Sequence, residues 1–131
     1  MAGIYIHIPF CKQKCTYCDF HFSTTFEEYR QKMIESIANE FVERKDYLEN
    51  KGINTIYFGG GTPSLLDQNE LQIIINAIYQ NFDVEEGIEI SLEANPDDIT
   101  DEKLEDWMAV GINRLSIGLQ SFKTEDLEWM N

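Results

Sequence analysis

The sequence places its three cysteines, Cys11, Cys15 and Cys18, within the stretch "CKQKCTYC". An odd number of thiols so close together cannot form a disulfide framework, and close-set cysteines in a reducing compartment indicate metal or redox chemistry. Three thiolates from one loop could hold a four-iron cluster and leave one iron open to an outside ligand. A structural zinc ion requires a fourth protein ligand, which neither His7 nor His21 obviously supplies. The i, i+4, i+7 spacing also suits three small side chains on a buried helix face.

The residues around the cysteines favour the iron–sulfur cluster over the other two interpretations. Pro9 and the β-branched run before it place the cysteines in a loop that leaves a strand. Lys12, Gln13 and Lys14 are polar, which does not suit a core segment. The lysines would also favour the thiolate form of the cysteines. The sequence therefore predicts an iron–sulfur cluster, with zinc and buried structural cysteines as the alternatives.

A glycine run and two polar residues are further candidates for ligand binding. Residues 59–63 read "GGGTP" directly after a β-branched run, so a ligand could approach their backbone closely. The run matches neither the Walker A pattern nor G-x-G-x-x-G, and a tight structural turn is the alternative. Glu93 and Gln120 each stand at the carboxyl end of an expected strand, where barrel active sites gather. A capped or solvated polar residue is the alternative for each.

The elements that must position these residues follow a pattern that occurs four times. Each repeat has a β-branched run, a loop with glycine, proline or cysteine, and a helix-like segment. The expected strands are residues 3–8, 53–58, 88–94 and 114–120, and the expected helices are residues 25–48, 67–79, 100–110 and 124–130. Asp67 is the expected N-cap of the second helix, and Gly111 the expected C-cap of the third. This alternation predicts an α/β fold with about four βα units and parallel strands.

Apolar and polar residues alternate within the expected strands. In the first strand, Ile4, Ile6 and Ile8 share one face, and Tyr5 and His7 share the other. A doubly wound sheet needs apolar residues on both faces. Here one face should take the helices, and the polar face suits a partial barrel around a polar ligand. An ordinary eight-stranded barrel has an apolar interior instead.

The polar face leads to three smaller predictions. Arg114 is expected to form an ion pair with Glu89 or Glu93, and His7 to make a hydrogen bond inside the polar interior. The open edge of the fourth strand is expected to be covered or to pair with another chain.

The composition excludes several functions. Acidic residues outnumber basic ones by 24 to 10, and the net charge of −14 disfavours non-specific nucleic-acid binding and anionic membrane surfaces. The N-terminal "MAGIYIHIPF" lacks the features of a signal peptide, and no apolar run is long enough for a membrane span. A cytoplasmic protein is expected.

Four motifs in one order carry a resemblance to a known family. "IYIHIPFCKQKCTYCDF", "YFGGGTPS", "EANPDD" and "GINRLSIGLQSF" resemble the radical S-adenosylmethionine (SAM) proteins of the oxygen-independent coproporphyrinogen III oxidase family and its HemW-like heme chaperones. The resemblance runs from Ile4 to Asn131. It implies a partial (β/α) barrel of the radical SAM type, with residues 1–131 as the N-terminal part of the core domain. The rest of the barrel and a C-terminal domain would lie outside this chain.

The resemblance also implies roles for individual residues. It implies a [4Fe–4S] cluster held by Cys11, Cys15 and Cys18. The cluster would cleave SAM by electron transfer, giving methionine and a 5′-deoxyadenosyl radical. The SAM contacts that it implies are Gly60, Gly61 and Thr62 at the methionine end, hydrogen bonds from Glu93 and Gln120, and packing by Tyr5 and Tyr17.

One position separates the two branches of the family. The oxidases carry a fourth cysteine two residues after the third, whereas Phe20 stands there in this chain. The resemblance therefore implies a heme chaperone that binds heme and passes it to an acceptor protein, which could be membrane-associated. The alternative is an oxidase that acts on coproporphyrinogen III, so enzymatic activity is left open. Both versions imply an electron donor.

Overall fold

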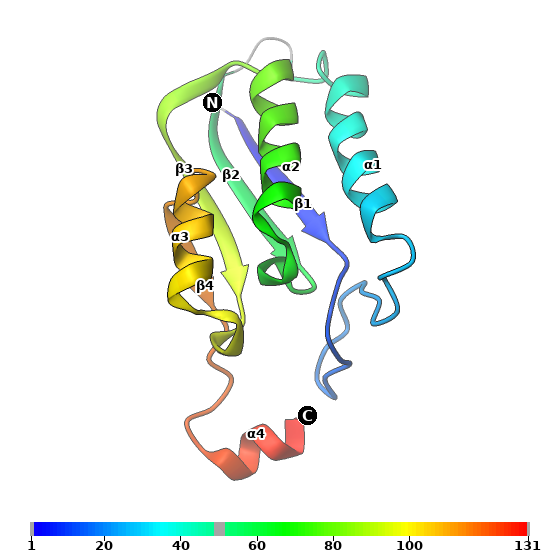
Figure 1. Cartoon of the computed structure of the whole chain (residues 1–131), viewed down its shortest axis with the longest axis vertical. Coiled ribbons are helices and arrows are strands. Elements are labelled where there is room, and N and C mark those ends of the chain that lie inside the picture. The colour runs from blue at the N-terminus through cyan, green and yellow to red at the C-terminus, as the bar shows by residue number, and fades with distance from the viewer. Residues whose placement is uncertain (1, 49–51, 131) are drawn as a thin grey trace.

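Four parallel strands form one sheet in the computed structural model, which describes residues 2–48 and 52–130. The strands are β1 (Ala2–Ile8), β2 (Ile53–Gly60), β3 (Val84–Ala94) and β4 (Arg114–Ile117), and they lie in the order β1-β2-β3-β4 (Figure 1). The carboxyl ends of parallel strands meet at one edge of a sheet, so the loops that follow the strands lie next to one another. The predicted α/β fold with about four βα units is confirmed.

Three helices cover one face of this sheet (Figure 1). They are α1 (Arg30–Glu43), α2 (Gln68–Asn81) and α3 (Asp101–Ala109). The short helix α4 (Thr124–Met130) lies beyond the carboxyl ends of the strands. Two single-turn 3₁₀ helices, η1 (Pro63–Leu65) and η2 (Pro96–Asp98), follow β2 and β3. None of the helices in the described ranges is long and apolar enough to cross a membrane.

The core lies between the helices and the apolar face of the sheet. Ile8, Phe58 and Leu92 of the strands are fully buried, as are Ile74 and Leu71 of α2. On the opposite face Tyr5 is 59% exposed, so in β1 the predicted alternation separates a buried face from an open one, whereas Ser91 on the polar face of β3 is fully buried.

Local signals fix two of the helix ends, one as predicted and one a residue earlier. Asp67 accepts a hydrogen bond from the Glu70 backbone N–H (2.9 Å), and the Glu70 side chain accepts one from the Asp67 N–H (2.8 Å), which completes a capping box. At the end of α3 the C-cap is Val110, one residue before the predicted Gly111, and Gly111 follows with φ +95°, the left-handed conformation that glycine adopts most easily.

The first helix is shorter than the predicted residues 25–48. Phe26 is buried and its ring stacks on Phe10 at a centroid distance of 4.5 Å, and residues 27–29 form a turn before α1 begins at Arg30. After Glu43 the chain turns again, with the Tyr47 N–H donating to the Arg44 carbonyl (2.9 Å). These contacts override a helical sequence pattern at both ends.

β1 begins one residue earlier and β2 ends two residues later than predicted, and two strand boundaries differ by more than that. The third strand begins at Val84 rather than at residue 88, because Val84 pairs with Ile53 of β2. The fourth ends at Ile117 rather than at residue 120, since a tight turn joins the Leu119 N–H to the Ile117 carbonyl (3.1 Å). Gln120 and Leu119 therefore lie in a loop, and Leu119 is 59% exposed instead of facing the core.

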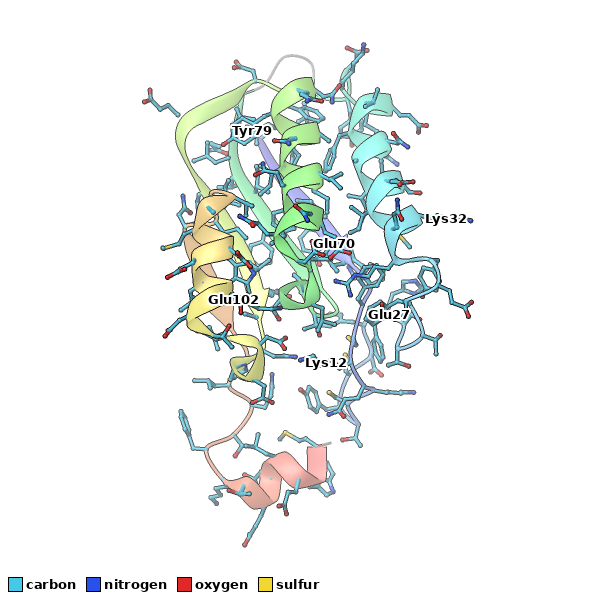
Figure 2. The ribbon with its side chains drawn as sticks, in the orientation of Figure 1. Lys12, Glu27, Lys32, Glu70, Tyr79 and Glu102 are labelled. Carbon is cyan, nitrogen blue, oxygen red and sulfur yellow. The ribbon has the colours of Figure 1, made fainter. Side chains whose placement is uncertain are left out.

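An ion pair joins the start of α1 to the start of α2. Arg30 donates to the Glu70 carboxylate (2.5 and 2.7 Å) and to the Leu65 carbonyl (2.6 Å). In Figure 2, Glu70 lies at the beginning of α2, whereas Lys32 of α1 points away from the sheet. The Arg30 guanidinium also lies over the Phe10 ring, at 5.9 Å from its centroid. This packing holds the residue that directly precedes Cys11.

Candidate cofactor-binding site

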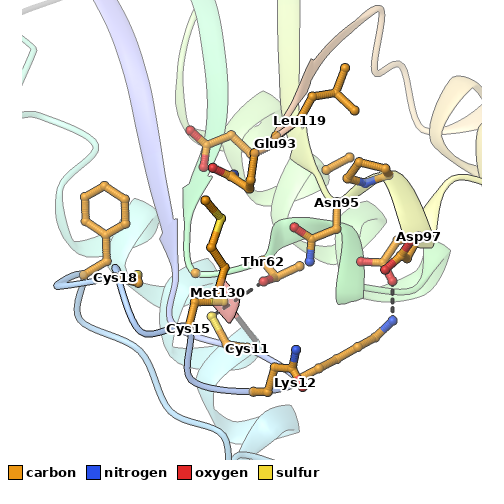
Figure 3. Close-up of a pocket in the computed structure, with 18 of the residues that line it drawn as sticks. Cys11, Lys12, Cys15, Cys18, Thr62, Glu93, Asn95, Asp97, Leu119 and Met130 are labelled. Carbon is orange, nitrogen blue, oxygen red and sulfur yellow. Dashed lines mark hydrogen bonds and ion pairs between the residues drawn. The ribbon is translucent and has the colours of Figure 1, made fainter. Parts of the chain in front are cut away.

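A cavity of about 750 Å³ opens at the carboxyl ends of the four strands (Figure 3). Loops that follow β1, β2, β3 and β4 supply its walls, together with α4. The structure brings all but one of the predicted site residues to this cavity: Cys11, Cys15, Cys18, Tyr17, Gly60, Gly61, Thr62, Glu93 and Gln120. Tyr5 does not line it.

The cysteines lie on the loop after β1, and all three are free thiols. Cys11 is buried, and its N–H donates to the Ser23 carbonyl (3.1 Å), which closes the base of the loop. Cys15 and Cys18 are half-buried, and the Cys18 N–H donates to the Cys15 carbonyl (3.2 Å). In residues 2–48 and 52–130, no three His, Cys, Asp or Glu side chains are arranged so that they already form a metal site. The chemistry of the donor set, three free thiols on one cavity wall, fits an iron–sulfur cluster.

The acidity of Cys11 differs from the expectation that nearby lysines favour the thiolate. Burial raises the pKa of Cys11, a hydrogen bond from the Thr62 hydroxyl (3.5 Å) lowers it, and the electrostatic influence of the nearby Cys18 and Cys15 raises it further. The net direction is upward. Lys12 is not among the groups that shift this pKa, and its ammonium pairs with Asp98.

Backbone hydrogen bonds join the glycine run to the cysteine loop. The Gly61 N–H donates to the Ile8 carbonyl (2.8 Å), and the Thr62 N–H donates to the Phe10 carbonyl (2.7 Å). A Cβ at Gly61 would lie 2.6 Å from the Phe10 oxygen, so only glycine allows this approach. Gly60 has φ +108°, which also favours glycine. The glycine run thus packs directly against the segment that leads into the cysteine loop.

Glu93 is held in place by two donors. Its Oε1 accepts a hydrogen bond from the Tyr57 hydroxyl (2.8 Å), and its Oε2 accepts one from the Gly60 N–H (3.2 Å). The hydrogen bond to Glu93 and burial raise the pKa of Tyr57. Sequence reasoning missed Tyr57. Its position on the polar face, paired in register with Tyr5 and Ser91, is the signal that could have found it.

The other predicted polar residues lie around this centre. Tyr17 is 49% exposed, and burial together with a hydrogen bond involving the Cys15 thiol raises its pKa. Tyr5 stacks on Tyr57 with ring centroids 6.0 Å apart, outside the cavity lining. Gln120 lines the cavity from the loop after β4.

One of the smaller predictions is confirmed, and a second is met only in part. Arg114 forms its ion pair with Glu89, at 3.0 Å, rather than with Glu93. His7 does make a hydrogen bond, donated by Nε2 to the His21 carbonyl (2.8 Å), but the bond is exposed and does not lie inside the polar interior.

Comparisons with known proteins point to one family. The radical SAM superfamily matches residues 5–131. The chain is 35% identical over 131 residues to the heme chaperone HemW of Haemophilus influenzae, covering 96% of this chain and 34% of that protein. It is 39% identical over 127 residues to the heme chaperone HemW of Buchnera aphidicola from Acyrthosiphon pisum, with the same two coverages of 96% and 34%.

A solved structure agrees. The chain superposes on coproporphyrinogen III oxidase (HemN) of Escherichia coli, a radical SAM enzyme, with a TM-score of 0.89 and 29% identity. The match covers 98% of this chain and 30% of that protein, so the chain spans about a third of the length of the relatives it matches. The match confirms the partial α/β barrel and the resemblance carried by the four motifs, and the chain belongs to the radical SAM superfamily.

Proposed function

We propose that this chain holds a [4Fe–4S] cluster through Cys11, Cys15 and Cys18 and binds SAM beside it, within a protein that binds heme and passes it to acceptor proteins. The observation that carries the proposal is that the three thiols share one cavity with the glycine run and Glu93. Relatives that are named heme chaperones support the heme part.

Several residues of this chain would contact bound SAM. A bound cluster supplies the electron for reductive cleavage of the SAM carbon–sulfur bond. The Glu93 carboxylate, held by Tyr57 and Gly60, offers an acceptor to the SAM ammonium group. Gly60, Gly61 and Thr62 would contact the methionine end. Gln120 and Tyr17 would complete the lining around SAM, whereas Tyr5 would act from outside the cavity, through its stacking on Tyr57.

The alternative is an oxidase that acts on coproporphyrinogen III. The structural match to the Escherichia coli enzyme favours it. Phe20 favours the chaperone, because it lines the cavity where an oxidase would place a further cysteine. Fold similarity by itself does not decide between functions.

The proposal extends to the setting of the protein. Residues 1–131 would be the N-terminal part of a larger radical SAM core domain in a cytoplasmic protein. Heme or a porphyrin, a heme-acceptor protein and an electron donor would be its partners.

Anaerobic reconstitution of the full-length protein with iron and sulfide tests the cluster. The expected result is an absorbance band at about 410 nm from thiolate-to-iron charge transfer. Replacing Cys15 by Ala should abolish the band, whereas Thr24→Ala in the same loop should leave it unchanged. A wild-type protein without the band would contradict the cluster proposal.

A second experiment separates the chaperone from the oxidase. The reconstituted protein is given SAM with either heme or coproporphyrinogen III under reducing conditions. Heme binding without turnover of the porphyrinogen is expected. Formation of a vinyl-bearing product would overturn the chaperone assignment in favour of the oxidase.

A further inference from the structure

Asp98 is a buried carboxylate at the rim of the cavity, outside the predicted binding residues. It lies in η2, after β3, and is 5% exposed. Its Oδ1 accepts a hydrogen bond from the Lys12 ammonium, and its Oδ2 accepts one from the Ser64 hydroxyl (2.6 Å). Burying a charged carboxylate costs free energy unless hydrogen-bond donors compensate for the lost water, and here each carboxylate oxygen has one such donor.

The surroundings of Asp98 make it a firm anchor. Ser64 is completely buried, and its hydroxyl also accepts a hydrogen bond from the Asn95 N–H (3.3 Å). The Ser64 carbonyl accepts one from the Lys103 ammonium of α3. The Asp98 N–H donates to the Asn95 carbonyl (3.0 Å). Apart from Lys12, the carboxylate is therefore bonded to Ser64 of η1, and Ser64 is itself held by α3 and by the segment that leads into η2.

Lys12 is the partner that can move. It directly follows Cys11, and its side chain is 60% exposed. Its side chain reaches from the cysteine loop across the cavity to the η2 segment (Figure 3). Exposed ion pairs usually contribute little to stability. Here Asp98 is buried, so removing the Lys12 charge would leave a buried carboxylate without its ion-pair partner. The pair attaches the first residue after Cys11 to the β3 side of the cavity.

We infer that Asp98 is a positioning residue, which holds the cysteine loop against the cavity wall through Lys12. That this loop supplies the cysteine ligands of a cluster rests on the proposed function. A loop that is ordered before iron binds gives up less conformational freedom when its three thiols converge. Weakening the ion pair should therefore loosen the loop in the metal-free protein and speed the loss of iron from the loaded one.

The test uses the full-length protein with Lys12→Gln, Asp98→Asn and the double variant. Lys14→Gln is the matched control for a lysine of the same loop, and Asp97→Asn for a neighbouring carboxylate on the cavity. Two measurements are made. One is hydrogen exchange of peptides that cover residues 12–18 in the metal-free protein. The other is the rate at which an iron chelator removes iron from the reconstituted protein.

The inference predicts faster exchange in residues 12–18 for Lys12→Gln and for Asp98→Asn, with neither control affected. It also predicts iron loss about tenfold faster in both single variants, with the double variant no worse than either.

Other outcomes overturn the inference. If Asp98→Asn leaves iron loss unchanged or slows it while Lys12→Gln speeds it, Lys12 acts through its own charge and not through Asp98. If Lys12→Gln behaves like Lys14→Gln in hydrogen exchange, Asp98 serves the fold alone, even where Asp98→Asn lowers the melting temperature. A wild-type protein that takes up no iron contradicts the proposed function, and hydrogen exchange still decides the positioning role.

Discussion

Tyr57 illustrates how a single hydroxyl can orient the polar centre of the cavity. It donates to one Glu93 oxygen while the Gly60 N–H donates to the other, so the carboxylate has a fixed direction. A hydrogen bond to a charged acceptor is stronger than one to a neutral acceptor. The affinity of the cavity for SAM should therefore depend on a residue that need not touch SAM.

The first residue-scale prediction replaces Tyr57 by Phe. SAM binding to the reconstituted protein should weaken about fivefold, as expected for loss of a hydrogen bond worth ~1 kcal/mol. Tyr79→Phe, on the exposed side of α2, is the control and should bind like the wild type. Isothermal titration calorimetry measures both. An unchanged dissociation constant for Tyr57→Phe, with Glu93→Gln impaired, would show that Glu93 needs no support from Tyr57.

The second residue-scale prediction concerns acid stability. Burial tends to raise the pKa of Asp98, but hydrogen bonds from Lys12 and Ser64 and the charges of Lys12 and Lys103 lower it overall. A carboxyl group whose pKa is lowered by folding stabilises the protein above its unfolded pKa of about 3.9, and this stability is lost as the pH falls through the folded value.

The free energy of unfolding should therefore differ between the wild type and Asp98→Asn by a constant amount near neutral pH. The difference should shrink below about pH 4, where the unfolded carboxyl group takes up a proton. Urea unfolding at a series of pH values measures it. A difference that stays constant into strong acid would show that the lowered pKa does not contribute.

At the scale of elements, the cavity depends on how closely two loops approach each other. The ladder between β1 and β2 continues past the strand ends, through hydrogen bonds from Gly61 and Thr62 to the segment that leads into the cysteines. Because those acceptors are backbone carbonyls, the loops cannot separate without loss of hydrogen bonds.

Gly61→Ala tests this approach. The added Cβ would meet the Phe10 and Ile8 carbonyl oxygens at 2.6 and 2.9 Å, and backbone atoms cannot rotate away. A loss of about 1–3 kcal/mol in the free energy of unfolding is expected, as for other overpacked sites. Gly52→Ala is the comparison, because an added Cβ there would meet only the flexible Glu85 side chain, at 3.2 Å, and no backbone atom. Equal effects in thermal unfolding would contradict a steric role for Gly61.

The elements also explain what could be read from the sequence. Asp67 and Gly111 act through neighbours within a few residues, so the two helix ends that they mark were predictable. The ends of α1 depend on the stacking of Phe26 on Phe10, and Asp98 depends on Lys12, 86 residues away. Motif spacing identified the thiols and the glycine run, whereas the residues that orient them become visible only in three dimensions.

At the scale of the whole molecule, helices cover one face of the sheet, and the polar face carries exposed side chains such as Tyr5. Ligands at the carboxyl ends of the strands would join loops from all four strands. Cluster and SAM should thus stabilise the fold as a unit.

The whole-molecule prediction is therefore a ligand dependence of the melting temperature. With the cluster in place, SAM at 100 times its dissociation constant should add about 2.7 kcal/mol by mass action. Removing the iron with a chelator should reverse the gain, and Cys15→Ala should show no gain at all. Differential scanning calorimetry under anaerobic conditions measures it. A melting temperature that SAM raises equally in Cys15→Ala would mean that SAM binds without the cluster.

The strand order β1-β2-β3-β4 is the same as the order of the strands in the chain. Each strand therefore pairs with the one that was synthesised just before it. Within these four strands, assembly can proceed by adding one βα unit at a time to the growing edge. The thiols of the first loop would thus meet the glycine run as soon as the second strand has docked, while the rest of the polypeptide is still being made.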